Sequence, residues 1–109
     1  MQGELKERPT FDIFKAYLRK AVREIMGVNI DDRHRWLDIG DEGQREEILN
    51  TLKRFLEAEY GVELVIPENL KGQDIAFETV AIQLHHVYST VYLMARINRK
   101  IFARRQNSY

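Results

Sequence analysis

The apolar positions follow a helical spacing in three stretches of the chain. In residues 10–26 they recur three and four apart and form one face, made of Phe11, Phe14, Leu18, Val22 and Ile25. In residues 44–60 a second face has the same spacing and consists of Ile48, Leu49, Leu52, Phe55, Leu56 and Tyr60. This spacing is typical of amphipathic α-helices that bury one side. The charged residues of the second stretch, Arg45 among them, are assigned to the opposite face, which meets solvent. Gly27 and Gly61 follow these stretches, where a left-handed glycine commonly ends a helix.

The third and longest pattern runs from residue 75 to residue 104 or 105. It fits a heptad frame, in which two sets of positions recur seven apart, Phe77, Leu84, Val91 and Asn98 beside Val80, Val87, Met94 and Ile101. A helix of roughly 30 residues is about 45 Å long, whereas a compact bundle of this size needs only ~25 Å. The first half of this helix is therefore expected to cover the other two, and the second half to extend beyond them.

Two apolar connections join these helices. Residues 28–43 contain the single tryptophan, Trp36, which is expected to be buried and to hold the connection against the core. Residues 62–66 are as apolar as a strand, but no second strand is available to pair with them, so we expect an extended, buried connector. Pro67 favours the first position of a short helix that includes Leu70.

These elements predict one all-α domain over residues 1–109. Residues 10–90 are expected to form a four-helix bundle with a long first loop. Residues 1–9 are polar and expected to be flexible. Residues 91–109 form a basic extension of the last helix. A composition of 44% hydrophobic and 31% charged residues is ordinary for a soluble globular chain.

The composition excludes several classes of protein. There is no cysteine, so disulfides and thiolate metal sites are excluded. No apolar run reaches the roughly 18 residues that span a bilayer. The first ten residues lack the apolar segment of a secretory signal, so a cytoplasmic location is expected.

The charge is divided unevenly along the chain. Residues 1–78 hold 12 basic and 17 acidic side chains, a net charge of −5, whereas residues 79–109 hold five basic and no acidic side chains. Such asymmetry can indicate an acidic partner for the C-terminal segment. Basic residues near a helix C-terminus also complement the helix dipole, and we favour this as the main cause.

Three phrases of the sequence, in order and with matching spacing, resemble the acyl carrier protein family over residues 15–90. They are residues 22–32 (VREIMGVNIDD), residues 36–41 (WLDIGD) and residues 55–64 (FLEAEYGVEL), the last followed after Val65 by residues 66–68 (IPE). The third is similar to the "LEEEFGIEIP" with which the family ends its second helix. The resemblance implies a small helical bundle with a long first loop, a turn into the second helix, a short third helix and a fourth.

The residue that carries the prosthetic group in that family has no counterpart here. The family has a Gly-x-Asp-Ser-Leu turn, whose serine accepts 4′-phosphopantetheine. The matching position is Glu46 if the alignment starts from the end of the second helix, and near Glu42 if it starts from the turn. The only serines, Ser89 and Ser108, lie in or beyond the last helix. We therefore expect no phosphopantetheine arm and no other cofactor.

Other chemical signals are weak. His85 and His86 are adjacent and would point about 100° apart on a helix, so they cannot hold one metal ion together. The acidic residues around the start of the second helix match no calcium loop, and they stabilise a helix dipole. No phosphate-binding loop and no Ser–His–Asp set is present. We predict neither a metal site nor catalytic residues, and no enzyme activity.

The predicted interaction surface lies on the last helix and comprises Met94, Ile97, Asn98, Arg99, Ile101, Phe102 and Arg105. An exposed apolar stripe of this length usually marks an interface, and a second copy of the chain is the simplest cover. Asn98 has two equally weighted interpretations. A buried asparagine on a coiled-coil seam sets register and partner number, whereas Asn98 lies in water if the helix has already left the core.

Three functional hypotheses follow. The first is a non-catalytic, acyl-carrier-like binding or adaptor module that acts through protein–protein contacts. The second is a genuine acyl or peptidyl carrier, or a lipid-binding bundle, in fatty-acid or secondary metabolism. The third is contact with nucleic acid or another acidic surface through the basic segment of residues 96–105; it ranks last, because the rest of the domain is acidic.

Overall fold

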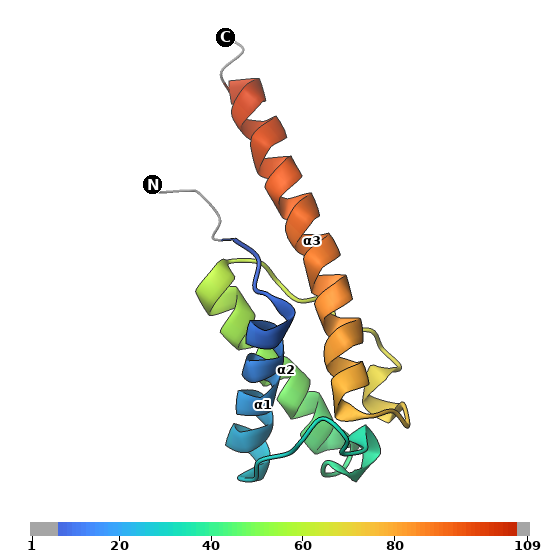
Figure 1. Cartoon of the computed structure of the whole chain (residues 1–109). Helices are drawn as coiled ribbons and strands as arrows, with labels where there is room; N and C mark the ends of the chain where they lie inside the picture. Colours follow the sequence, from blue (N-terminus) through green and yellow to red (C-terminus); the bar gives the residue numbers. More distant parts are fainter. Residues whose placement is uncertain (1–6, 107–109) are drawn as a thin grey trace.

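The computed structural model describes residues 7–106, with side chains up to residue 98, and within this range it has three α-helices and no strand (Figure 1). The elements in chain order are α1 (Phe11–Met26), the 3-10 turn η1 (Trp36–Asp38), α2 (Glu42–Tyr60), the 3-10 turn η2 (Leu70–Gly72) and α3 (Phe77–Gln106). The predicted all-α class is confirmed. Residues 1–6, part of the segment expected to be flexible, and residues 107–109 lie outside the described residues.

The ends of α1 and α2 follow the local signals in the sequence. The Thr10 hydroxyl accepts a hydrogen bond from the Ile13 backbone N–H at 3.3 Å and so caps α1. Gly27 and Gly61 have φ angles of 71°, as predicted for the residues that end the two helices. A side chain with a Cβ would be strained at both positions.

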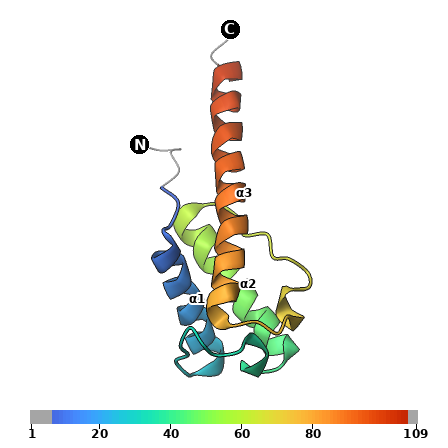
Figure 2. The same cartoon turned by 45° about the vertical axis from the view of Figure 1, so that its right-hand side comes forward.

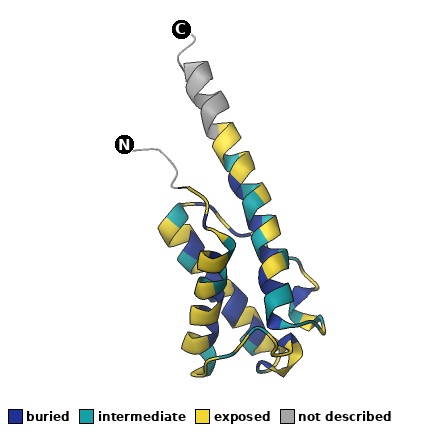
Figure 3. Ribbon diagram, in the orientation of Figure 1, coloured by how far each residue is buried: buried dark blue, intermediate teal, exposed yellow. Residues whose placement is uncertain are grey.

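The three helices bury one shared core, which appears as the dark blue stripes on their facing sides (Figure 3). Its fully buried side chains include Phe14, Leu18 and Val22 of α1, Leu52 and Leu56 of α2, and Phe77, Leu84 and Tyr88 of α3. Phe55 was also expected to be buried, but it is only half-buried. Its ring lies at the edge of the core, 6.3 Å from the ring of Tyr17 and 4.9 Å from the Lys20 ammonium group.

The predicted short helix that begins at Pro67 is not formed, and η2 takes its place. Distant side chains bind the carbonyl groups of this turn. The Leu70 carbonyl accepts a hydrogen bond from Trp36 Nε1 at 3.0 Å, and the Lys71 carbonyl accepts one from Arg45 Nε at 2.7 Å. The Leu70 carbonyl also accepts the Gln73 N–H at 3.2 Å, which closes this single turn. The chain then extends towards α3, so the structure does not confirm a four-helix bundle.

The first loop is held against the bundle as predicted. Trp36 is fully buried, and its backbone N–H donates to the Ile75 carbonyl at 2.7 Å. The Phe77 N–H donates to the His34 carbonyl at 2.7 Å, so the loop satisfies a donor in the first turn of α3. The first loop therefore positions the start of the longest helix (Figure 2).

An ion pair anchors the same loop to α1. The Asp32 carboxylate pairs with Lys15 Nζ at 3.0 Å and with the Arg19 guanidinium. The hydrogen bond from Lys15 is the main reason that the pKa of the Asp32 carboxyl lies below its usual value, and the charge of Arg19 adds to it. A lowered pKa means that this stabilisation is present at neutral pH and is lost as the pH falls through that pKa.

The segment between α2 and η2 is extended, as predicted, and its side chains alternate between core and solvent. Val62 and Leu64 are buried, whereas Val65 is exposed. The hydroxyl of Tyr88 on α3 donates to the Val62 carbonyl at 3.2 Å. This hydrogen bond places the C-terminal end of α2 beside the middle of α3.

Candidate functional site

The resemblance to carrier proteins predicts that the turn before α2 corresponds to the place where they attach their prosthetic group. Here it is built as a helix cap. The Asp41 carboxylate accepts from the Gln44 N–H at 2.8 Å, and the Gln44 side-chain oxygen accepts from the Asp41 N–H at 2.9 Å. Gly40 has a φ of 63°, and a Cβ at this position would lie 2.6 Å from the Gln44 side-chain oxygen. This capping box stabilises the helix start and makes Gly40 necessary.

The two serine-equivalent positions both present carboxylates. Glu42 and Glu46 are exposed, and their oxygens lie 3.7 Å and 3.5 Å from Lys71 Nζ. The first hydroxyl along α2 belongs to Thr51, which is 2% exposed and accepts a hydrogen bond from Arg54 at 3.0 Å. The turn therefore contains no hydroxyl that could form a phosphodiester.

Arg45 is the residue that the sequence interpretation misplaced. It was assigned to the solvent face of the second helix, but it is only 7% exposed. Nη1 donates to the carbonyls of Leu37 at 3.2 Å and Gly40 at 2.7 Å, and Nε donates to that of Lys71 at 2.7 Å. Arg45 therefore joins both loops to α2. Arg45 lies three, four and seven positions before the buried Ile48, Leu49 and Leu52, so the helical spacing indicates its burial but not its carbonyl partners.

Part of the predicted interaction surface is visible on the outer half of α3. Tyr92 is the last buried side chain of this helix in the described part of the chain, at 2% exposure. Met94 and Ile97 follow at 59% and 54% exposure, and Asn98 is also exposed. In the single chain Asn98 therefore lies in water.

The remaining predicted interface residues lie beyond the described side chains. Arg99, Ile101, Phe102 and Arg105 belong to the last turns of α3, of which only the backbone is described. Leu93, which the sequence interpretation did not single out, is 46% exposed. Leu93 and Ile97 are four residues apart and so share one face of the helix.

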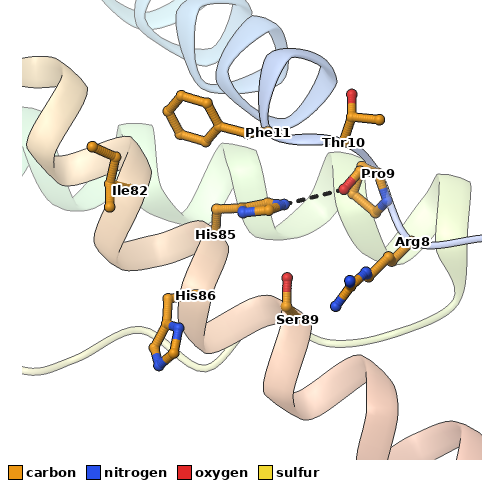
Figure 4. A pocket seen from close by; sticks show the side chains of 8 residues that line it. All are labelled: Arg8, Pro9, Thr10, Phe11, Ile82, His85, His86 and Ser89. Atoms are coloured by element: carbon orange, nitrogen blue, oxygen red, sulfur yellow. Dashed lines mark hydrogen bonds between the residues drawn. The ribbon is translucent and has the colours of Figure 1, made fainter.

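His85 fixes the N-terminal segment to α3. Its Nε2 lies 3.1 Å from the Pro9 carbonyl oxygen, and its ring is edge-on to those of Phe11 and Phe14, with centroids 5.6 and 5.3 Å apart. His86 is exposed, and its ring points away from that of His85 (Figure 4). Within the described residues, no three potential metal ligands come together.

Two tyrosines in the core have raised pKa values. Burial raises the pKa of the Tyr88 phenol well above its usual value, and burial beside Tyr17 raises that of Tyr60. Both phenols are therefore neutral at physiological pH. They serve packing and hydrogen bonding and are not poised for proton transfer.

Comparison with protein-family models, with curated proteins and with solved structures finds no match to this chain. The resemblance to acyl carrier proteins therefore remains a prediction from the three sequence phrases. No helix in the described part of the chain has the length and apolarity that crossing a bilayer requires.

Proposed function

We propose that this chain is a non-catalytic, acyl-carrier-like binding module that acts as an adaptor through protein–protein contacts and carries no phosphopantetheine arm. The order of elements supports this proposal: a long first loop, a tight turn into α2 and a single turn before the last helix. The carboxylates of Glu42 and Glu46 at the serine-equivalent positions support the absence of an arm.

The observation that carries the proposal is the outer half of α3. Ala95 is the last side chain of α3 that packs against the core in the described residues, and beyond it the helix extends past the bundle to Gln106 (Figure 1), over about 16 Å at the usual helical rise. Leu93, Met94 and Ile97 are exposed by 46%, 59% and 54%. Three large apolar side chains so close together in solvent are costly, and they mark a surface that binds protein.

A second copy of the chain is the partner that the charges favour. The outer half of α3 is basic, whereas the C-terminal end of α2, which lies beside the middle of α3, presents the exposed carboxylate of Glu57. Antiparallel packing of two outer halves would place the basic end of each chain near the acidic α2 of the other. Parallel packing would bring the basic ends together, which like-charge repulsion disfavours.

Substitution of the shared face tests this dimer. We expect the full chain to dimerise weakly, with a dissociation constant in the micromolar range, because the outer halves of α3 that would form the contact are short. A Leu93→Gln, Ile97→Gln double variant should be monomeric and should melt like the natural chain at low concentration, since both side chains are exposed. Sedimentation equilibrium measures the association, and added salt should weaken it.

Ile82→Gln is the matched control, because Ile82 is 51% exposed on the same helix but belongs to the half of α3 that packs against the bundle. This variant should dimerise like the natural chain. A full-length chain that stays monomeric at about 100 μM, a concentration well above a micromolar dissociation constant, would reject the homodimer. The apolar face would then belong to a foreign protein partner.

A phosphopantetheinyl transferase with coenzyme A tests the absence of the arm. We expect the intact mass of the natural chain to stay unchanged, because neither Glu42 nor Glu46 has a hydroxyl. A Glu46→Ser variant asks whether the enzyme recognises the fold when a hydroxyl is supplied, and an ordinary carrier protein shows that the enzyme is active. An arm on the natural chain would establish the carrier hypothesis instead.

A further inference from the structure

A cavity of about 600 Å³ lies between the N-terminal segment and the middle of α3 (Figure 4). One wall comes from the residues that lead into α1, and the other from two turns of α3. Its lining consists of Arg8, Pro9, Thr10, Phe11, Ile82, His85, His86 and Ser89. Its volume is within the range of cavities that hold small molecules in proteins.

The floor of this cavity is apolar and held in place. Pro9 is buried, and Phe11 packs edge-on against His85. The contact of His85 Nε2 with the Pro9 carbonyl, at 3.1 Å, joins the two walls. Ile82, which is 51% exposed, supplies apolar surface at one end. A ligand would therefore meet a preformed apolar surface rather than a loose chain end.

The polar groups of the lining favour an anion. Its ionisable residues are Arg8, His85 and His86, and none of the lining residues is acidic. Within the described part of the chain, the Arg8 guanidinium makes no hydrogen bond or ion pair, and the Ser89 hydroxyl makes no hydrogen bond. Both side chains reach the same end of the cavity (Figure 4). They are available to a ligand.

A second cavity has a different charge pattern. That cavity has a volume of about 500 Å³ and lies beside the first half of α2. Its ionisable lining residues are Glu46, Glu68 and Lys71, so an anion there would face two carboxylates. The cavity beside α3 is therefore the one of these two that suits a negatively charged ligand.

We propose that the cavity between the N-terminal segment and α3 binds a small carboxylate borne on an aromatic body. The carboxylate receives hydrogen bonds from the Arg8 guanidinium, which is suited to bidentate pairing, and from the Ser89 hydroxyl. The aromatic body packs on Phe11 and Ile82. This inference does not depend on the proposed adaptor function, because the cavity is separate from the apolar face of Leu93 and Ile97.

Titration of the full chain with 4-phenylbutyrate, followed by two-dimensional NMR, tests the proposal. We expect saturable shifts centred on residues 8–11 and 82–89, with a dissociation constant on the order of 1 mM for so small a probe. The uncharged 4-phenylbutanol should bind more weakly. Arg8→Gln should weaken binding of the carboxylate by about threefold to tenfold and leave binding of the alcohol unchanged.

Arg23→Gln is the matched control, because Arg23 is an exposed arginine at the other end of α1. It should bind the probe like the natural chain. Ser89→Ala should weaken binding of the carboxylate alone. The proposal is overturned if the shifts do not saturate, if they centre on other residues, or if the Arg8 and Arg23 variants weaken binding equally. All variants alter exposed or half-buried side chains, so their spectra should retain the dispersion of the folded chain.

Discussion

Leu52→Ala is expected to lower the free energy of unfolding by about 2–5 kcal/mol. Leu52 is fully buried in the middle of α2, within the core that all three helices share. The substitution removes apolar contacts and leaves a cavity that the neighbouring helices cannot fill completely. Domains of this size are stable by about 5–15 kcal/mol in total, so the variant would lose a large part of its stability.

Urea denaturation followed by far-ultraviolet circular dichroism measures this loss. Leu93→Ala is the matched control, since it is the same chemical change at a side chain that is 46% exposed. Measured at protein concentrations too low for dimerisation, it should change the stability by no more than about 0.5 kcal/mol. A Leu52 variant as stable as this control would show that α2 buries a different face.

The helices could be predicted from the sequence because their signals are local. Thr10 and Gly27 at the ends of α1, and Gly61 after α2, act through the backbone of their own neighbourhood. Apolar residues spaced three and four apart define a buried face without knowledge of the partner. The same local reasoning predicted burial of Phe55, which lies on the edge of that face and is only half-buried.

The features that the sequence did not reveal depend on contacts between distant segments. Trp36 Nε1 reaches the Leu70 carbonyl, 34 residues away, and Arg45 Nε reaches the Lys71 carbonyl, 26 residues away. These two bonds hold the single turn at the point where a fourth helix was expected. No spacing rule within the segment around Leu70 indicates that its carbonyls are used in this way.

Of the two candidate sites, one could be predicted from local signals in the sequence and the other depends on contacts between distant segments. The length and heptad pattern of the last helix predicted that its second half leaves the bundle, and the exposure of Met94 and Ile97 agrees with this. The cavity beside α3 was not predicted, because Arg8 and Ser89 are 81 positions apart in the sequence. Only the packing of the N-terminal segment on His85 brings them to one place.

The packing of the two loops leads to a second large effect. Arg45→Met should destabilise the chain by about 3 kcal/mol, because it removes hydrogen bonds to three carbonyl groups and leaves these acceptors without their donor. Methionine retains the apolar stem of the side chain, so little of the loss arises from a cavity. Arg23→Met on α1 is the control; Arg23 is exposed and should be replaceable at a cost within about 0.5 kcal/mol.

Tryptophan fluorescence distinguishes local loosening of the loops from a general loss of stability. In the natural chain Trp36 is fully buried, so its emission should be blue-shifted and poorly quenched by iodide. In the Arg45→Met variant, quenching should increase under conditions where the helical content is unchanged, because η1 and η2 have lost the side chain that joins them to α2. Arg45→Lys should also increase the quenching, since one ammonium group cannot replace a guanidinium group that reaches three carbonyls. A methionine variant with the urea midpoint and the iodide quenching of the natural chain would show that other contacts are sufficient to hold both loops.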